Sequence, residues 1–199
     1  MPDLLILASQ STIRRDLLQN AGLQVECYPA RVDEAAIKVA LLTQNASPRD
    51  VADALADIKA RRIAGKFPGR LVLGADQILV HKGKIFDKPD TIAAAKKQLL
   101  ALRGQSHLLF SAAVIYDQGA PVWRYVGRAE LTMRNFSGAF LESYLAEMGD
   151  DLFTTVGGYK LESVGLQLFS AVKGDYFSIL GLPLLEVLEF LRGKGICQT

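Results

Sequence analysis

Short apolar runs alternate along the chain with segments in which apolar residues recur at helical spacing. The runs at residues 4–7 and 71–75 are typical of buried strands. Residues 17–21 repeat apolar side chains on one helical face, and Gly22 ends that segment. The first strand is therefore predicted to lead through a polar turn into a helix. Strands that alternate with helices indicate an α/β domain with a mixed sheet.

Four further helices are predicted from their starting residues. Ser47-Pro48-Arg49-Asp50 combines a serine cap, a proline in the first helical position and an acidic residue three positions after the cap. Similar starts follow Thr91, Ser137 and Pro183. These four helices alternate with predicted strands, as expected for the α/β class.

Two pairs of strands are predicted in the second half of the chain. Residues 107–116 and 122–132 flank the turn Asp117-Gln118-Gly119, and residues 166–172 and 177–180 have the pattern of a second hairpin. No repeat, low-complexity segment or linker interrupts the pattern. Residues 1–199 are therefore predicted to form one domain with two lobes.

Composition narrows the class of protein. Half of the residues are hydrophobic, but no apolar run is long enough for a membrane span. The net charge of +2 gives no general reason to expect nucleic acid or an acidic membrane as a partner. The segment Met1–Leu7 lacks the basic start of a signal peptide. The two cysteines are far apart in the sequence; Cys27 is predicted to lie in the core, and Cys197 is predicted to be a free thiol. A reducing cytoplasm is the expected location.

A polar, basic segment opens the first predicted helix. Ser9 and Ser11 precede the helix, and Arg14 and Arg15 lie in its first turns. Free amides at a helix N-terminus, hydroxyl donors and paired guanidinium groups suit phosphate. A serine-capped surface helix with solvated arginines is the alternative.

Asp76 lies between two apolar runs, where an unpaired carboxylate is costly. A metal ligand or general base would explain its position, because carboxylate oxygen is a preferred ligand of magnesium and manganese. A strand-end turn acid is the alternative. Weaker candidates are Glu34 after Asp33, Lys59 on a predicted helix, and Lys88, which Pro89 biases towards an extended conformation.

The glycine-rich segment 157–165 is a further candidate. Glycines around Tyr159 and Glu162 suit a loop that approaches a flat ligand closely, although an ordinary bend has the same composition.

Taken together and in order, these motifs resemble the Maf family of nucleotide pyrophosphatases. The resemblance covers essentially the whole chain. It is carried by Leu7-Ala8-Ser9-Gln10-Ser11 with Arg14-Arg15 and Leu17-Leu18, Val32-Asp33-Glu34, Lys59-Ala60, Gly74-Ala75-Asp76-Gln77, Lys88-Pro89, Gly158-Tyr159 with Glu162 and Gly165, and Gly181-Leu182-Pro183.

The resemblance implies an inosine-triphosphatase-like fold, with an elongated mixed sheet flanked by helices and a cleft between two lobes. It implies hydrolysis of nucleoside triphosphates to monophosphate and pyrophosphate by water activated with Mg²⁺ or Mn²⁺. By resemblance, Asp76 is the catalytic base and a metal ligand, and Glu34 is the second metal ligand. A homodimer and a house-cleaning role in the cytoplasm are further expectations of the family.

The resemblance also implies which residues bind the substrate. Those residues are Ser9, Ser11, Arg14, Arg15, Lys59 and Lys88 for the triphosphate, and Gln77 and Glu162 for substrate choice. The two-residue spacing between Ser11 and Arg14, together with Gln77 and Glu162, is similar to the branch that acts on 7-methyl-GTP rather than the branch that acts on dTTP and UTP. A carboxylate at position 162 also suits a cationic methylated purine.

Two positions depart from the family pattern. Thr12 stands where proline is usual, and Phe110-Ser111-Ala112 stands where a Thr-Gly pair is common. Neither change removes a charged group from the predicted site, so activity is expected to survive.

Two other functions compete with this prediction. A nucleotide-sensing regulator of cell division would retain the phosphate site without needing Asp76. A haloacid-dehalogenase-type phosphatase is prompted by Asp87-Lys88-Pro89-Asp90, but the spacing of its two acids is three where that class needs two.

Overall fold

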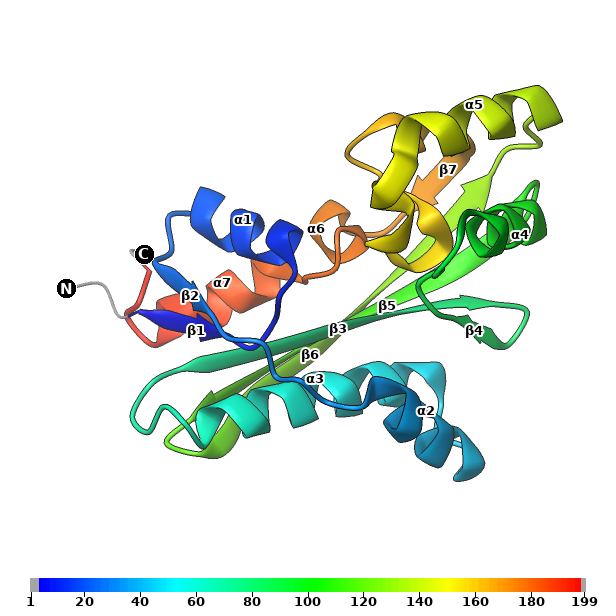
Figure 1. The fold of residues 1–199 in the computed structure, drawn as a ribbon. Helices are drawn as coiled ribbons and strands as arrows, with labels where there is room; N and C mark the ends of the chain where they lie inside the picture. The colour runs from blue at the N-terminus through cyan, green and yellow to red at the C-terminus, as the bar shows by residue number, and fades with distance from the viewer. Residues whose placement is uncertain (1–3, 198–199) are drawn as a thin grey trace. The chain divides into compact units, whose positions relative to one another are not determined.

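The computed structural model describes residues 4–197, so the prediction for Met1–Leu7 lies in part outside the described residues. The strands and helices along the chain are shown in Figure 1. In order they are β1 (Leu5–Leu7), α1 (Thr12–Asn20), β2 (Val25–Cys27), α2 (Glu34–Thr43), α3 (Pro48–Ala64), β3 (Val72–His81), β4 (Lys84–Phe86), α4 (Ile92–Leu102), β5 (Ser106–Asp117), β6 (Ala120–Met133), α5 (Gly138–Met148), the 3-10 helices η1 (Gly149–Phe153), η2 (Val156–Gly158) and η3 (Val164–Leu168), β7 (Phe169–Lys173), α6 (Tyr176–Ile179) and α7 (Leu184–Gly193).

The strands form one seven-stranded sheet of order β2-β1-β3-β5-β6-β7, with β4 paired to β3. The β1 strand is parallel to both β2 and β3, whereas β4 and β7 are antiparallel to β3 and β6. The predicted mixed α/β sheet flanked by helices is therefore confirmed. Within residues 4–197, no helix is long and apolar enough to cross a bilayer.

The chain divides into two compact units, and β3, β5 and β6 contribute to both. Unit 1 comprises residues 4–77, 110–127 and 176–197, and unit 2 comprises residues 78–109 and 128–175. A cleft between two lobes stays a prediction.

Capping explains where several helices begin. Ser47, Thr91 and Ser137 each accept a hydrogen bond from the backbone N–H three residues later. The sequence predicted the cap at Ser47 and helix starts after Thr91 and Ser137. Such bonds satisfy backbone donors that have no partner inside the helix.

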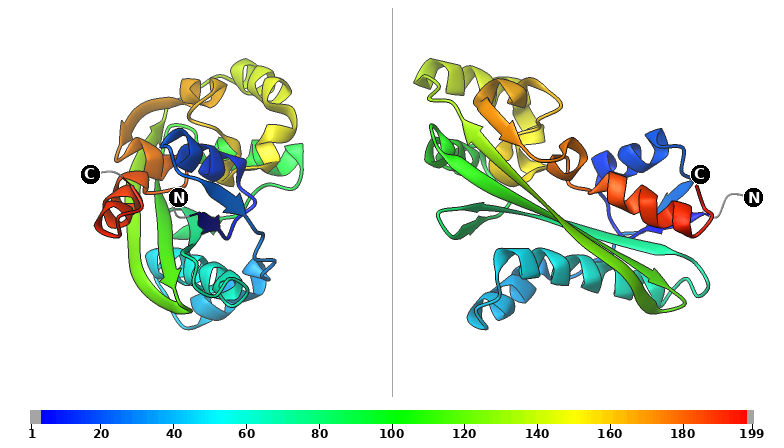
Figure 2. Two further views of the ribbon diagram at one scale, coloured as in Figure 1. Left: turned by 90° about the vertical axis from the view of Figure 1, so that its left-hand side faces the viewer. Right: turned by 180° about the vertical axis from the view of Figure 1, so that it is seen from behind.

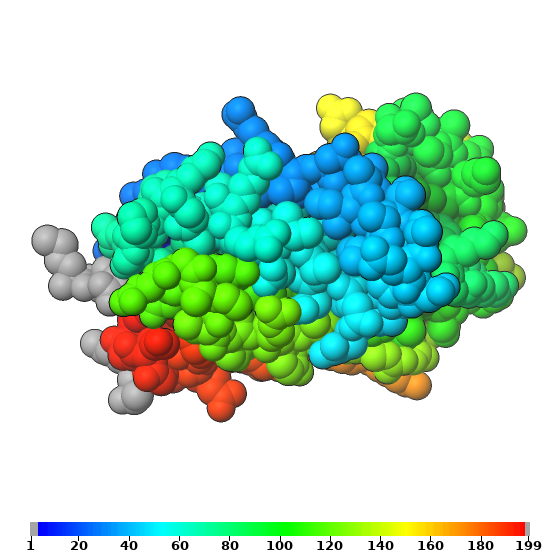
Figure 3. Space-filling view, turned by 90° about the horizontal axis from the view of Figure 1, so that it is seen from below, coloured from blue at the N-terminus to red at the C-terminus, as the bar shows by residue number. Residues whose placement is uncertain are grey.

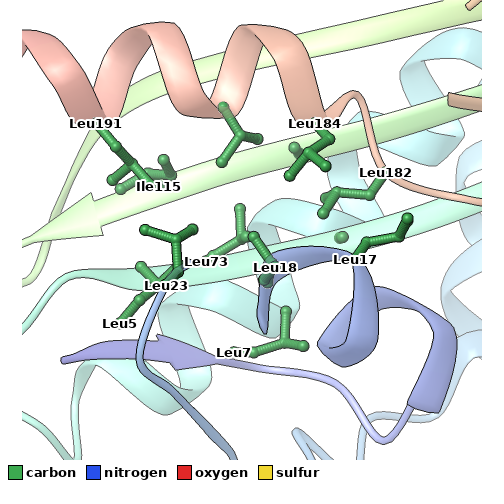
Figure 4. Close-up of a cluster of buried hydrophobic side chains, with 13 residues drawn as sticks. Leu5, Leu7, Leu17, Leu18, Leu23, Leu73, Ile115, Leu182, Leu184 and Leu191 are labelled. Carbon is green, nitrogen blue, oxygen red and sulfur yellow. The ribbon is translucent and has the colours of Figure 1, made fainter. Parts of the chain in front are cut away.

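Unit 1 packs helices on two faces of its strands. On one face, α1 and α7 cover β1, β3 and β5, and their leucines form the apolar cluster drawn in Figure 4. On the other face lies α3, as the views in Figure 2 show. The α2 helix packs beside α3, and the two together form much of the surface seen in Figure 3.

Two sequence predictions about the elements were wrong. The predicted hairpin of residues 166–172 and 177–180 is instead η3, the strand β7 and the short helix α6. Cys27, predicted in the core, is exposed on β2. The β2 strand lies at the edge of the sheet, and Glu26 beside Cys27 is exposed as well.

In unit 2, the glycine-rich segment packs internally. The ring of Tyr159 is buried against Phe169, and its hydroxyl lies 2.7 Å from Nε2 of His107. Gly157 has a φ of +80°, and a Cβ there would lie 2.7 Å from Leu79. These contacts favour the alternative of an ordinary bend over a loop that stacks Tyr159 on a ligand.

His107 makes stability in unit 2 depend on pH. Burial, with a smaller contribution from His81, lowers the pKa of His107 from 6.5 to about 4. Between these pH values the unfolded chain therefore binds more protons than the folded chain. The contribution of His107 to the free energy of unfolding is fully present above pH 6.5 and falls as the pH drops towards 4. We expect wild type to lose about 2 kcal/mol at pH 5 relative to pH 7.5 through this residue.

Urea unfolding of wild type and His107→Gln at both pH values tests this expectation. The glutamine retains a polar partner for Tyr159 but does not titrate. The variant should therefore lose less stability on acidification than wild type. Equal losses in the two proteins would contradict the assignment to His107.

Candidate active site

Strand β3 carries Asp76 and Gln77 in its middle, not at its end. The alternative of a strand-end turn acid is therefore wrong. Gly74, two residues earlier, lies on the same face as Asp76, because side chains alternate along a strand. A Cβ on Gly74 would lie 2.2 Å from the Ala56 carbonyl oxygen and 2.6 Å from the Ala60 nitrogen. The missing side chain thus lets α3 pack directly on β3.

This close packing brings Lys59 of α3 to Asp76. The Lys59 Nζ lies 2.6 Å from Oδ1 of Asp76 and 2.7 Å from Oε1 of Glu34. The side chains of Lys59 and Asp76 are 11% and 8% exposed, whereas that of Glu34 is 43% exposed. Two acids 42 positions apart in sequence therefore converge on one ammonium group.

The electrostatic surroundings of Asp76 suit a proton acceptor. Burial raises the pKa of Asp76, while the positive charges of Lys59 and Arg14 oppose that rise. Glu34 raises the pKa of Asp76 slightly further. A carboxyl group that is more basic than an exposed aspartate and lies beside two cations matches the needs of general base catalysis.

Glu34 is the first residue of helix α2, which the sequence analysis did not predict. Asp33 caps that helix, accepting a hydrogen bond from the Ala36 N–H at 3.0 Å. Its apolar residues Ile37, Val39, Leu41 and Leu42 are spread around the helix, so no single apolar stripe marked it in the sequence. The cap fixes the backbone from which Glu34 reaches Lys59.

The serines predicted to bind phosphate follow the carboxyl end of β1. The Ser11 side chain caps α1 by accepting from the Arg14 N–H, and the Ser9 Oγ accepts from the Ser11 N–H at 3.1 Å. In parallel sheets, ligands commonly bind beyond the carboxyl ends of the strands. The first turn of α1 and the middle of β3 therefore belong to one region of unit 1.

Arg14 is held by main-chain oxygens on both sides. Its Nε donates to the Gly181 carbonyl at 2.8 Å, and its Nη1 donates to the Ala75 carbonyl at 3.1 Å. Ala75 immediately precedes Asp76, so the guanidinium group is fixed beside that carboxylate. Burial lowers the pKa of Arg14, and the charges of Asp76 and Glu34 oppose this change.

Arg15 has a different environment. Its guanidinium pairs with Asp16, with Nη2 to Oδ1 at 2.8 Å, and its side chain is 43% exposed. A role of Arg15 in binding phosphate stays a prediction.

Gln77 is tied to residues far away in sequence. Its Nε2 donates to Ser111 Oγ at 3.0 Å and to the carbonyls of Ser178 and Ile179 at 3.2 and 2.9 Å. Because carbonyls only accept, the amide nitrogen must face them. The buried Ser111 also donates to the Ser178 carbonyl at 2.6 Å. In the sequence, Ser111 stands out only as a departure from the family pattern, and that departure is the one signal of this network.

Lys88 and Glu162 belong to unit 2, and both are exposed. The other predicted site residues, Ser9, Ser11, Arg14, Arg15, Glu34, Lys59, Asp76 and Gln77, belong to unit 1. The roles of Lys88 and Glu162 stay predictions.

The carboxylate pair is compatible with a divalent metal. Among residues 4–197, no group of three or more His, Cys, Asp or Glu side chains gathers that could hold a metal ion alone. Magnesium needs no such group, because it is commonly bound by one or two carboxylates together with water and substrate phosphates. The oxygen donors of Glu34 and Asp76 fit that pattern.

The sequence of this chain matches a known protein family and several named proteins over nearly its whole length. Residues 4–194 match the family described as Maf-like protein. Proteins named nucleoside triphosphate pyrophosphatase from Ruegeria pomeroyi and Caulobacter vibrioides are 50% and 49% identical to this chain. The alignments cover 98% and 95% of this chain and 98% and 94% of those proteins. Nucleoside triphosphate pyrophosphatase 1 from Jannaschia sp. is 52% identical over 96% of this chain and 97% of its own length.

Among solved structures, a HAM1 protein from Coxiella burnetii gives a TM-score of 0.44 at 19% identity, covering 67% of this chain and 74% of that one. The family match and the relatives near 50% identity each extend over nearly the whole sequence. This chain therefore belongs to the Maf family.

Proposed function

We propose that this protein hydrolyses nucleoside triphosphates to nucleoside monophosphates and pyrophosphate. The observation that carries the proposal is the convergence of Glu34 and Asp76 on Lys59, beside the fixed guanidinium of Arg14. The names of relatives about 50% identical over nearly their whole length support the same reaction.

In this reaction, water attacks the α-phosphorus and its proton passes to the Asp76 carboxylate. The bond from the α-phosphorus to the bridging oxygen breaks, and pyrophosphate leaves with the electron pair. Mg²⁺ or Mn²⁺, held by Glu34 and Asp76, would neutralise charge on the phosphate oxygens and lower the pKa of its water. Lys59 and Arg14 supply positive charge close to that point, while Ser9, Ser11, Arg15 and Lys88 are the further phosphate-binding candidates.

A methylated purine nucleotide, of which 7-methyl-GTP is the example, is the proposed preferred substrate. Support comes from the spacing of Ser11 and Arg14, from Gln77 next to Asp76, and from Glu162. A glutamate carboxylate accepts hydrogen bonds from a guanine edge and attracts the positive charge of a 7-methylated ring.

Turnover of a panel of nucleotides, measured by pyrophosphate release, tests both the proposed reaction and the proposed substrate. With Mg²⁺ or Mn²⁺, 7-methyl-GTP is expected to have the highest kcat/KM among 7-methyl-GTP, GTP, dTTP and UTP. Glu162→Gln should reduce the preference for 7-methyl-GTP over GTP by about tenfold, the effect of roughly 1.4 kcal/mol. The matched charge change Glu189→Gln, on the exposed side of α7, should leave the preference unchanged.

Other results of the panel would redirect the proposal. A clear lead for dTTP or UTP would assign the chain to the other branch and retain the reaction. Tight nucleotide binding without pyrophosphate release would favour the regulator of cell division. Release of orthophosphate in place of pyrophosphate would favour a phosphatase.

The biological setting is also a proposal. A cytoplasmic house-cleaning enzyme that removes modified nucleotides fits the proposed substrate, and a homodimer is the expected assembly. Sedimentation of the purified chain at micromolar concentration measures the assembly directly.

A further inference from the structure

A single ammonium group stands between the two carboxylates of the candidate site. Lys59 Nζ is within 2.7 Å of oxygens of both Glu34 and Asp76, and its side chain is 11% exposed. An ammonium donates hydrogen bonds to carboxylates in the same region that a hard divalent cation would use. A metal that binds Oε1 of Glu34 or Oδ1 of Asp76 must therefore compete with Lys59 for that oxygen.

Formal charges in this cluster cancel. Glu34 and Asp76 contribute two negative charges, and Lys59 and Arg14 contribute two positive charges. A bare divalent cation would bring two more positive charges next to Lys59 and Arg14 in a partly buried site, where charges are poorly screened. A metal that enters together with a triphosphate brings a net negative charge, and the phosphate oxygens offer Lys59 new acceptors.

We propose that Lys59 is a resident counter-ion that excludes bare divalent metal from Glu34 and Asp76 and releases them when a triphosphate arrives. The inference rests on the proposed function, because it assigns the metal and the triphosphate to this one site. Metal and triphosphate then bind with positive coupling, and each increases affinity for the other by the same factor.

Metal binding without nucleotide tests the first half of the inference. Mn²⁺ binding to the full chain is measured at pH 8 by electron paramagnetic resonance of the free ion. We expect Lys59→Met to bind Mn²⁺ at least about tenfold more tightly than wild type, because it removes the competing charge. Lys59→Gln, which keeps an amide donor for the carboxylates, is measured alongside in case the methionine variant does not fold.

Two further variants serve as controls. Lys66→Met removes an exposed positive charge just after α3 and should bind Mn²⁺ as wild type does. Adding Asp76→Asn to Lys59→Gln should abolish the gain in Mn²⁺ affinity, because it removes one of the two ligands.

Binding of a triphosphate without metal tests the second half. Inorganic tripolyphosphate is titrated calorimetrically into each protein in the presence of EDTA. The two Lys59 variants should bind it at least about tenfold more weakly than wild type, because a phosphate-binding charge is lost. If Lys59 had a purely structural role, its replacement would weaken binding of both Mn²⁺ and tripolyphosphate. Tighter binding of Mn²⁺ together with weaker binding of tripolyphosphate is therefore the distinguishing result.

The inference is overturned if a folded Lys59 variant binds Mn²⁺ no more tightly than wild type, or binds tripolyphosphate equally well. That result can occur in an enzyme that releases pyrophosphate, so it leaves the proposed function standing. If the two affinities changed in opposite directions but the wild-type protein released no pyrophosphate, the counter-ion role of Lys59 would be supported and the proposed function rejected.

Discussion

Replacing Asp76 with asparagine is expected to lower kcat/KM for triphosphate hydrolysis by about a thousandfold, because general base catalysis contributes factors of this order. Asparagine has nearly the same shape but does not accept the proton of the attacking water. Asp76 is buried and its carboxylate faces Lys59 at 2.6 Å, so the change removes charge with little change in volume. Pyrophosphate release under steady-state conditions measures the loss.

The matched control is Asp117→Asn. Asp117 pairs with Lys194 at 3.4 Å, within unit 1 but outside the carboxylate cluster, so its loss should leave kcat/KM within about twofold of wild type. Wild-type turnover by Asp76→Asn would reject the assignment of the base. A wild-type protein that binds nucleotide but does not turn it over would reject the enzyme itself.

Adding one methyl group at Gly74 should destabilise the protein by about 3 kcal/mol, as overpacking against backbone does. The new Cβ would lie 2.2 Å from the Ala56 carbonyl oxygen, so either α3 or β3 must move. Lys59 lies on α3 and Asp76 on β3, so their contact would open as well. Urea unfolding of Gly74→Ala measures the loss of stability.

Gly138→Ala is the control for this substitution. Gly138 is exposed at the start of α5, and a Cβ there meets nothing within 4 Å. Its unfolding free energy should stay within about 0.5 kcal/mol of wild type. If Gly74→Ala were equally stable, close packing of α3 on β3 would not be what positions Lys59.

Local sequence predicted the elements whose determinants are local. Ser47, Thr91 and Ser137 each make the capping bond that their sequence indicated. The predicted neighbours 107–116 and 122–132 are β5 and β6, joined at Gln118 and Gly119 with φ of +48° and +81°. Such turns bring adjacent strands together without help from distant residues.

Elements without a periodic pattern were not found. The α6 helix has four residues, about one turn, so its apolar residues resembled a strand as much as a helix. The apolar residues of α2 are spread around the helix, which left no single stripe to detect. In both cases the conformation depends on packing that a single sequence does not display.

The candidate site was predictable as a set of residues but not as a set of contacts. Glu34, Lys59 and Asp76 were all identified, yet their meeting depends on the packing of α3 against Gly74. The bonds of Gln77 to Ser111 and to the α6 backbone join three distant segments, and no local pattern specifies them. Gly181-Leu182-Pro183 entered only as part of the family resemblance, and the Gly181 carbonyl holds Arg14.

The bond between Arg14 and Gly181 also bears on how the protein is made. The two residues are 167 positions apart. Arg14 therefore cannot bond to the Gly181 carbonyl until nearly the whole chain has been synthesised. A nascent chain that ends before α6 carries Asp76, Lys59, Glu34 and the Ala75 carbonyl but lacks the second carbonyl that holds Arg14. The site is thus completed as one of the last events of synthesis.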